Sequence, residues 1–287
     1  MKNIGKKFSL WTKYGALNSH PVFEAFAQGA ARLGHTCREN ITVSDVDVIW
    51  SVLWRGRMQG NQSIFNRAKQ KNKPVIVLEV GALNRGKTWK MAVNGITNDC
   101  FYGLSDIDNT RIKKLSLQEK PWKKQDGAIL LTGQHRQSQQ WDTPQHMDFW
   151  LKDTVTKIRQ NTDRKIILRP HPRCPISMDN FRHIKHISYQ RPNRLSNTYD
   201  DYDLDFKDVS CLVNYSSNPG IISAIAGIPI FVSNKSLAWP VSNTEYNTIE
   251  NPIMPDRTDW LNKISYTEWT LEEISTGYPL SRLTSAL

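Results

Sequence analysis

The sequence predicts an α/β protein of two domains, each a parallel sheet covered by helices on both faces. Short apolar runs of strand length alternate with amphipathic helical stretches, and this alternation is typical of parallel sheets. It stops at a charged, Pro-containing stretch over residues 111–127 and then begins again, as at a domain boundary. We therefore expect domains over residues 1–122 and 123–287, the last helix being a candidate to return to the first domain.

The first domain is predicted from three strands and two helices. Apolar runs with the length of buried strands cover residues 8–12, 46–54 and 74–80. A helix begins near Pro21, because Pro is favoured in a first turn, and ends at Gly34, because Gly is favoured after a last turn. A second, more polar helix over 61–71 carries its apolar residues on one face.

The second domain repeats this construction. Its apolar runs predict strands over residues 128–132, 165–168, 211–215 and 229–232. Helices are expected over residues 148–161, 218–226 and, in a less regular tail, 268–274.

Composition excludes several classes of protein. Hydrophobic residues make up 39% of the 287 residues, which is enough for packed cores and excludes a disordered chain. No apolar run approaches the ~20 residues that span a bilayer, and no signal peptide follows the basic N-terminus. The four Cys form no C-x-x-C pair, so we expect no metal and a reducing, cytoplasmic setting. We expect a monomer without membrane association.

Positive charge is concentrated in the first half of the chain. The net charge of +11 follows from 38 Lys and Arg against 27 Asp and Glu. Residues 1–125 hold 21 of the former and 9 of the latter, whereas residues 126–287 hold 17 and 18. A basic half attracts polyanions or anionic surfaces, although an ordinary solvated surface has the same composition.

Polar groups follow three predicted strands of the second domain, at the edge where parallel α/β sheets bind ligands. They form Thr132-Gly133-Gln134-His135-Arg136, Arg169-Pro170-His171-Pro172-Arg173 and Tyr215-Ser216-Ser217-Asn218-Pro219-Gly220. Gly133 permits close approach of a phosphate, and the amides at the start of the next helix attract anions. Each motif has an ordinary alternative, such as a Ser217 helix cap. Together they favour a nucleotide-diphosphate site.

The same motifs resemble the C-terminal half of GT-B glycosyltransferases. Arg169-Pro170-His171-Pro172, Tyr215-Ser216-Ser217 and Ala224-Ile225-Ala226-Gly227-Ile228-Pro229-Ile230 are most similar to capsule-polysaccharide and teichoic-acid-type transferases. The resemblance implies two Rossmann-like domains facing a cleft, with the acceptor on the first and the sugar nucleotide on the second. It implies a nucleotide-diphosphate sugar, such as a UDP-sugar, as co-substrate and no other cofactor. The implied donor-binding residues are Thr132, Gly133, Gln134, Arg169, His171, Arg173, Ser216, Ser217 and Asn218.

The first half resembles small bacteriophage glycosyltransferases around residues 50–58 and 85–90. With the charge surplus, this resemblance implies double-stranded DNA as acceptor, the sugar being added to a hydroxymethylated pyrimidine such as 5-hydroxymethylcytosine. Cationic side chains would neutralise phosphates, and a Trp could stack on an extruded base or could equally belong to the core. The candidate acceptor-binding residues are Lys13, Trp54, Arg55, Arg57, Arg85, Lys87, Trp89 and Lys90.

An inverting transfer needs a base that removes the acceptor proton. Glu79 stands alone in an apolar predicted strand and is the first candidate, with a structural ion pair to Arg85 or Lys87 as the alternative. His20 and Asp47 are further candidates for the catalytic base, and a retaining mechanism stays open.

Several alternatives stay open. The same fold could glycosylate a cell-surface polysaccharide or a teichoic-type polymer, or could be a DNA-binding module without catalysis. Residues 81–88 match G-x-x-x-x-G-K-[ST] after a predicted strand, so a P-loop phosphotransferase is another alternative. Asp201-Tyr202-Asp203 has the composition of a metal-binding D-x-D element but does not end a predicted strand.

Overall fold

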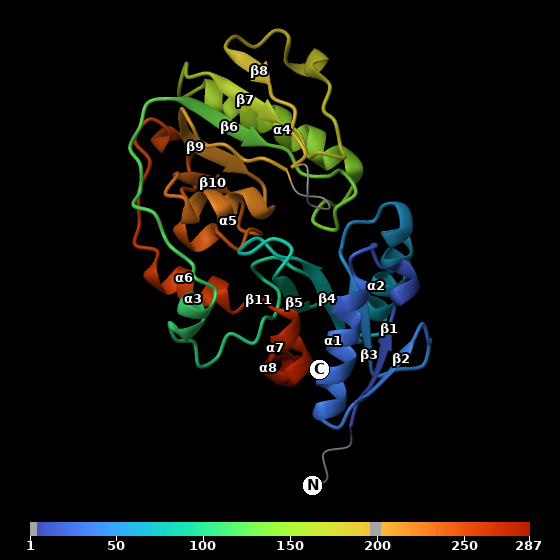
Figure 1. Ribbon diagram of the computed structural model, residues 1–287. Coiled ribbons are helices and arrows are strands. Elements are labelled where there is room, and N and C mark those ends of the chain that lie inside the picture. Colours follow the sequence, from blue (N-terminus) through green and yellow to red (C-terminus); the bar gives the residue numbers. More distant parts are fainter. Residues whose placement is uncertain (1–4, 196–201) are drawn as a thin grey trace. The chain divides into compact units, whose positions relative to one another are not determined.

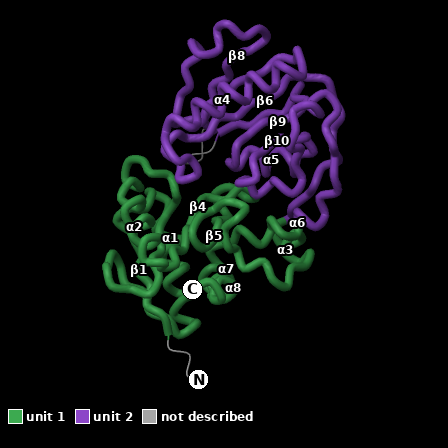
Figure 2. Tube along the Cα trace, turned by 180° about the vertical axis from the view of Figure 1, so that it is seen from behind, with its two compact units in different colours: residues 1–115, 262–287 green, residues 116–261 purple. Residues whose placement is uncertain are grey.

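The computed structural model describes residues 5–195 and 202–287 and divides the chain into two compact units (Figures 1 and 2). Unit 1 consists of Met1–Leu115 and Asn262–Leu287, and unit 2 consists of Ser116–Leu261. The division after Leu115 lies inside the charged stretch over 111–127. The chain thus leaves unit 1, forms the whole of unit 2 and then returns.

The sheet of unit 1 has the strand order β11-β5-β4-β3-β1-β2. Its strands are β1 (Lys7–Leu10), β2 (Thr36–Glu39), β3 (Val46–Trp50), β4 (Val75–Val80), β5 (Trp89–Val93) and β11 (Glu268–Trp269). Strands β1 to β4 are parallel, whereas β5 and β11 extend the sheet in antiparallel pairing. The three apolar runs of the first half are confirmed as strands, and β2, β5 and β11 were not predicted.

Helices cover both faces of this sheet. The covering helices are α1 (His20–Arg32), α2 (Gly60–Gln70), α7 (Leu271–Thr276) and α8 (Tyr278–Leu283), and a short helix, α3 (Thr110–Lys114), follows β5 in the chain. Residues of α1, α7 and α8 share one core with Val48 and Ile76, and residues of α2 share another with Ile49 and Val77. Neighbouring strand residues point to opposite faces, which is why β3 and β4 contribute to both cores.

The predicted helix over 268–274 is divided in the structure. Glu268–Trp269 pairs with β5, and α7 begins only after Thr270. The Thr270 hydroxyl accepts from the backbone N of Glu273, and the Glu273 side chain accepts from the backbone N of Thr270. This capping box fixes the start of α7 and leaves the two preceding residues for the sheet.

The sheet of unit 2 is entirely parallel, with the order β10-β9-β6-β7-β8. Its strands are β6 (Ala128–Thr132), β7 (Ile166–Arg169), β8 (Ile187–Tyr189), β9 (Val209–Asn214) and β10 (Ile230–Val232). Helix α4 (Pro144–Arg159) shares a core with alternate residues of β6, β7 and β9, and α5 (Asn218–Ile225) packs against β9 and β10. Helix α6 (Thr258–Ser265) leads back to unit 1. The four strands predicted here are confirmed.

Short 3-10 helices complete the fold at Thr12–Tyr14, Gly56–Gln59, Met178–Phe181, Trp239–Val241, Tyr246–Thr248 and Thr284–Ala286. Among the described residues, no helix combines the length and the apolar character needed to cross a bilayer.

Candidate functional site

Three of the predicted motifs meet at the carboxyl edge of the unit 2 sheet. Thr132 ends β6 and lies in register with Arg169, which ends β7, and with Asn214, which ends β9. The backbone N of Gly133 donates to the carbonyl O of Arg169 at 2.8 Å. A Cβ at Gly133 would lie 2.8 Å from Cδ1 of Ile176, so a larger residue there would require the end of the Ile176 side chain to move.

Asn214 joins the loops that follow β6 and β9. Its side chain is 1% exposed, and its Nδ2 donates to Thr132 Oγ1 and to Ser217 Oγ, both at 2.8 Å. Its Oδ1 has no hydrogen-bond partner among the described residues. Sequence reasoning missed Asn214 because it closes an apolar run. A polar last residue of a buried strand was the signal that could have identified it.

A second polar cluster surrounds Ser216. The Ser216 Oγ lies 3.0 Å from Gln134 Oε1 and 2.8 Å from Gln140 Oε1. The backbone N of Ser216 also donates to Gln134 Oε1, at 3.3 Å, and Gln134 Nε2 donates to Ser138 Oγ at 3.2 Å. Gln134 is buried. The Gln134 side chain therefore connects the two loops. The sequence predicted that this side chain would bind the sugar nucleotide, but its amide is used inside the protein.

His171 and His135 form a ring pair in the loops after β7 and β6. Their rings pack edge to face with centroids 5.2 Å apart. His171 Nδ1 accepts from the backbone N of Arg173, and His135 Nδ1 accepts from the backbone N of Gln137, both at 3.1 Å. A neutral ring whose Nδ1 accepts carries its proton on Nε2. Arg173 is exposed and His171 is partly exposed, whereas His135, which sequence reasoning did not select, is buried.

Helix α5 begins directly after the paired Ser. Ser217 is its N-cap residue with extended backbone, but the Ser217 side chain makes no capping hydrogen bond, and Pro occupies the first turn. Ser216, Ser217 and Asn218 are all partly exposed. A helix start with this exposure and the positive end of the helix dipole is suited to an anion.

Arg169 has a different role from the predicted phosphate contact. It is 6% exposed, its Nη2 lies 2.7 Å from Asp203 Oδ1, and its Nη1 donates to Gln190 Oε1 at 3.3 Å. Burial acts to raise the pKa of Asp203, but hydrogen bonds from Arg169 and Asn193 outweigh it and lower that pKa. Arg169 is thus committed to an internal ion pair.

The D-x-D element is described only in part. Asp203 pairs with Arg169, and Asp201 lies outside the described residues. In the part of the chain that the structure describes, no three His, Cys, Asp or Glu side chains are grouped so as to hold a metal ion.

Two of the three candidate bases in unit 1 are accessible. Glu79 is the second-last residue of strand β4 and is partly exposed, and its Oε1 accepts from the backbone N of Val80 at 2.8 Å. His20 is the first residue of α1, is exposed, and its Nδ1 lies 3.4 Å from Glu24 Oε1.

The third candidate, Asp47, is wrong as a base. It is 0% exposed and lies near the start of β3, at the amino edge of the sheet. Its carboxylate accepts from Trp11 Nε1 at 2.8 Å and lies 3.0 Å from Lys73 Nζ. These contacts make Asp47 a structural carboxylate.

The predicted acceptor-binding residues divide by exposure. Five cations are exposed: Lys13, Arg55, Arg57, Arg85 and Lys87. Trp89 is partly exposed and lies opposite Trp269 in the sheet. Trp54 is 8% exposed and packs against Phe65 of α2 with ring centroids 5.7 Å apart. Trp54 is therefore a core residue and not a surface on which a base could stack.

The loop that matches a P-loop binds an internal carboxylate. Glu268 accepts from the backbone N of Ala82 at 2.6 Å, from that of Leu83 at 3.0 Å and from Thr88 Oγ1 at 2.8 Å. Lys90 Nζ lies 3.4 Å from Glu268 Oε1, and both residues are buried. The place of a phosphate is occupied, and a strand, β5, follows instead of a helix. Both the P-loop alternative and the Lys90 acceptor contact are therefore wrong.

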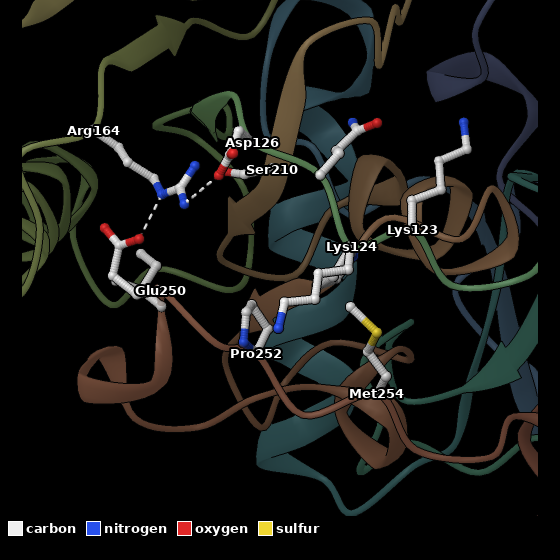
Figure 3. A pocket seen from close by; sticks show the side chains of 11 residues that line it. Lys123, Lys124, Asp126, Arg164, Ser210, Glu250, Pro252 and Met254 are labelled. Carbon is white, nitrogen blue, oxygen red and sulfur yellow. Dashed lines mark hydrogen bonds and ion pairs between the residues drawn. The ribbon is translucent and has the colours of Figure 1, made fainter.

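A pocket of about 140 Å³ lies at the opposite, amino edge of the unit 2 sheet (Figure 3). Arg164 on its wall donates from Nη2 to Asp126 Oδ1 at 3.0 Å and from Nε to Glu250 Oε2 at 2.7 Å. Its position at the starts of the strands separates this pocket from the motifs at the carboxyl edge.

Comparisons with known proteins identify the fold through a solved structure and not through sequence. No protein-family model matches the chain, and no curated protein matches it significantly in sequence. A structure described as Thermosulfurimonas dismutans KpsC, beta Kdo 2,7 transferase, is similar with a TM-score of 0.53 at 14% identity, over 97% of this chain and 99% of that one. The chain therefore has the predicted GT-B-like fold of two α/β domains.

Two further structures are similar at lower TM-scores. Thermosulfurimonas dismutans KpsC, beta Kdo 2,4 transferase, gives 0.47 at 8% identity, over 93% of this chain and 91% of that one. An S. aureus MnaA-UDP co-structure gives 0.35 at 11% identity, over 97% and 98%.

Proposed function

We propose that this protein is a glycosyltransferase that binds a nucleotide-activated sugar on unit 2 and transfers the sugar to a saccharide acceptor. One observation carries the proposal: His171, in the loop after β7, and Ser217 with the start of α5, after β9, are brought to the carboxyl edge of one parallel sheet. A ring N–H, a hydroxyl and a helix start are groups that bind phosphate oxygens. In α/β sheets this edge is where ligands bind.

The likeness to a Kdo transferase supports a saccharide acceptor. It extends over almost the whole length of both chains, whereas the alternative acceptor, modified DNA, depends on charge and on a resemblance of short segments. A UDP-sugar is the first donor to test, because two phosphates can use both the His171 ring and the start of α5.

The reaction would proceed by attack of an acceptor hydroxyl oxygen on the anomeric carbon. The bond from that carbon to the phosphate oxygen breaks, and its electron pair leaves with the nucleotide. We assign to Glu79 the acceptance of the hydroxyl proton, since its carboxylate is partly exposed at the end of β4. His171 Nε2–H would stabilise the charge that develops on the leaving phosphate.

The test is donor turnover. The purified protein is incubated with a panel of nucleotide-activated sugars bearing one or two phosphates, and with oligosaccharide acceptors, and product is followed by mass spectrometry. We expect one donor to be consumed and its sugar to appear on a saccharide. A protein that neither binds nor consumes any donor of the panel contradicts the proposal.

DNA is the second candidate acceptor, favoured by the charge of unit 1. This unit carries 20 Lys and Arg against 11 Asp and Glu, and unit 2 carries 18 against 16. If duplex DNA with 5-hydroxymethylcytosine is the acceptor, its affinity should fall steeply with salt while donor affinity changes little. Transfer of labelled sugar to such DNA, and not to saccharides, would decide for this candidate.

A further inference from the structure

The two bonds that Asn214 donates fix the direction of two hydroxyl groups. An amide N–H is only a donor, so Thr132 Oγ1 and Ser217 Oγ both act as acceptors toward Asn214 Nδ2. A hydroxyl has a single proton. The protons of Thr132 and Ser217 must therefore point away from Asn214.

The Thr132 proton stays inside the protein. Thr132 is buried, and its Oγ1 lies 3.4 Å from the carbonyl O of Val213, to which it donates. The Ser217 proton has no such recipient among the described residues, because the only hydrogen bond that Ser217 Oγ makes there is the one it accepts from Asn214. Ser217 is partly exposed, so its proton is available to a ligand.

Ser216 is in the opposite situation. The oxygens nearest to its hydroxyl are the side-chain Oε1 atoms of Gln134 and Gln140, at 3.0 and 2.8 Å. A side-chain carbonyl oxygen only accepts, so the Ser216 proton is used within the protein. The two adjacent Ser, which are equivalent as a sequence motif, therefore differ as hydrogen-bond donors.

We propose that Asn214 is a positioning residue that makes the Ser217 hydroxyl, and not the Ser216 hydroxyl, a hydrogen-bond donor to the phosphate of the sugar donor. This inference rests on the proposed function. In this orientation Asn214 Nδ2 donates two hydrogen bonds, and the buried Oδ1 has no partner among the described residues. The Ser217 hydroxyl then adds a neutral donor beside the positive end of α5.

The experiment measures the affinity of the protein for UDP and for inorganic pyrophosphate by calorimetry. Ser217→Ala should lower UDP affinity about tenfold, the effect of one hydrogen bond to a charged group. Ser216→Ala, the matched control from the adjacent position, should change it less than about threefold.

Asn214→Asp tests the positioning role. A carboxylate only accepts, so it would take the Ser217 proton and turn the oxygen lone pairs toward the ligand. We expect UDP affinity to fall about tenfold or more. In the Asn214→Asp background, Ser217→Ala should then cost little further, because the hydroxyl no longer donates. A purely structural role for Asn214 would leave the effect of Ser217→Ala undiminished.

The outcomes separate the two proposals. Wild-type protein that binds neither probe and no donor of the panel overturns the proposed function. Wild-type protein that binds UDP, with equal losses for the two Ser variants or with wild-type affinity in Asn214→Asp, overturns only the positioning role. Thermal unfolding is recorded for each variant, and if Asn214→Asp does not fold, the comparison of the two Ser variants still decides.

Discussion

At the scale of single residues, His171 is the side chain on which donor binding should depend most. Its Nδ1 is held by the backbone of Arg173, and the opposite nitrogen carries the proton. His171→Ala should therefore lower donor affinity about tenfold, as expected for a hydrogen bond to a charged phosphate. Calorimetry with the best donor measures this. The exposed His183 of the same unit is the control, and equal losses for both variants would contradict the assignment.

Glu79 should affect turnover and not binding. Glu79→Gln keeps the size of the side chain but removes the ability to accept a proton, so we expect the transfer rate to fall at least about a hundredfold. Donor affinity should stay within about twofold of the wild type. Single-turnover kinetics make the measurement, and Glu272→Gln, on the exposed face of α7, is the control. Near-normal turnover in Glu79→Gln would exclude Glu79 as the base.

At the scale of elements, the loop over 81–88 depends on a carboxylate supplied from the far end of the sequence. Glu268→Gln weakens the hydrogen bonds from Ala82, Leu83 and Thr88 and removes the negative charge that lies 3.4 Å from the buried Lys90 Nζ. We expect a loss of about 3 kcal/mol in the free energy of unfolding. Urea unfolding measures it, and a loss no larger than that of Glu272→Gln would contradict this account of the loop.

The stability of the fold should decrease in acid, because the carboxylate of Glu273 in α7 pairs with Arg111 of α3. Burial acts to raise the pKa of Glu273, but hydrogen bonds from Arg111 and the backbone of Thr270 outweigh it, and the pKa is lowered. A carboxyl whose pKa is depressed in the folded state stabilises the fold above its unfolded pKa of about 4.3 and loses this contribution as the pH falls through the folded value. Unfolding at pH 7, 5, 4 and 3 should show that loss, reduced in Glu273→Gln.

Local patterns predicted most elements, and long-range pairing explains those that they missed. Strand β11 is two residues long and forms only because β5 is beside it, so no local window of sequence contains its cause. The motifs at the carboxyl edge were predicted correctly as loops after strands, because the end of an apolar run marks the end of a buried strand. That Arg169 binds Asp203 and that Gln134 binds Ser216 could not be predicted, because a polar side chain near a site has the same composition whether it faces ligand or protein.

At the scale of the whole molecule, unit 2 is an insertion into unit 1. Arg111 of α3 donates from Nε to the carbonyl O of Ser265 at 2.8 Å and from Nη2 to that of Glu268 at 2.6 Å, so the returning segment is bonded into unit 1. A chain that ends at Leu261 should keep unit 2 folded, whereas the backbone amides of unit 1 should lose their protection against hydrogen exchange. Amide hydrogen exchange measures this protection separately for the two units. Full protection of the β4 amides in the shortened chain would contradict the prediction.

The return of the chain also sets an order of assembly during synthesis. A ribosome releases residues 5–115 first, yet this part lacks Glu268 and the hydrophobic residues of α7 and α8 that complete its core. The segment made in between contains all of unit 2. Nascent domains generally fold from the N-terminus onward. Here unit 2 can fold first, although it is synthesised later than residues 5–115. Unit 1 can complete its core only after α7 and α8 have been translated, and until then its first part stays accessible to chaperones and proteases.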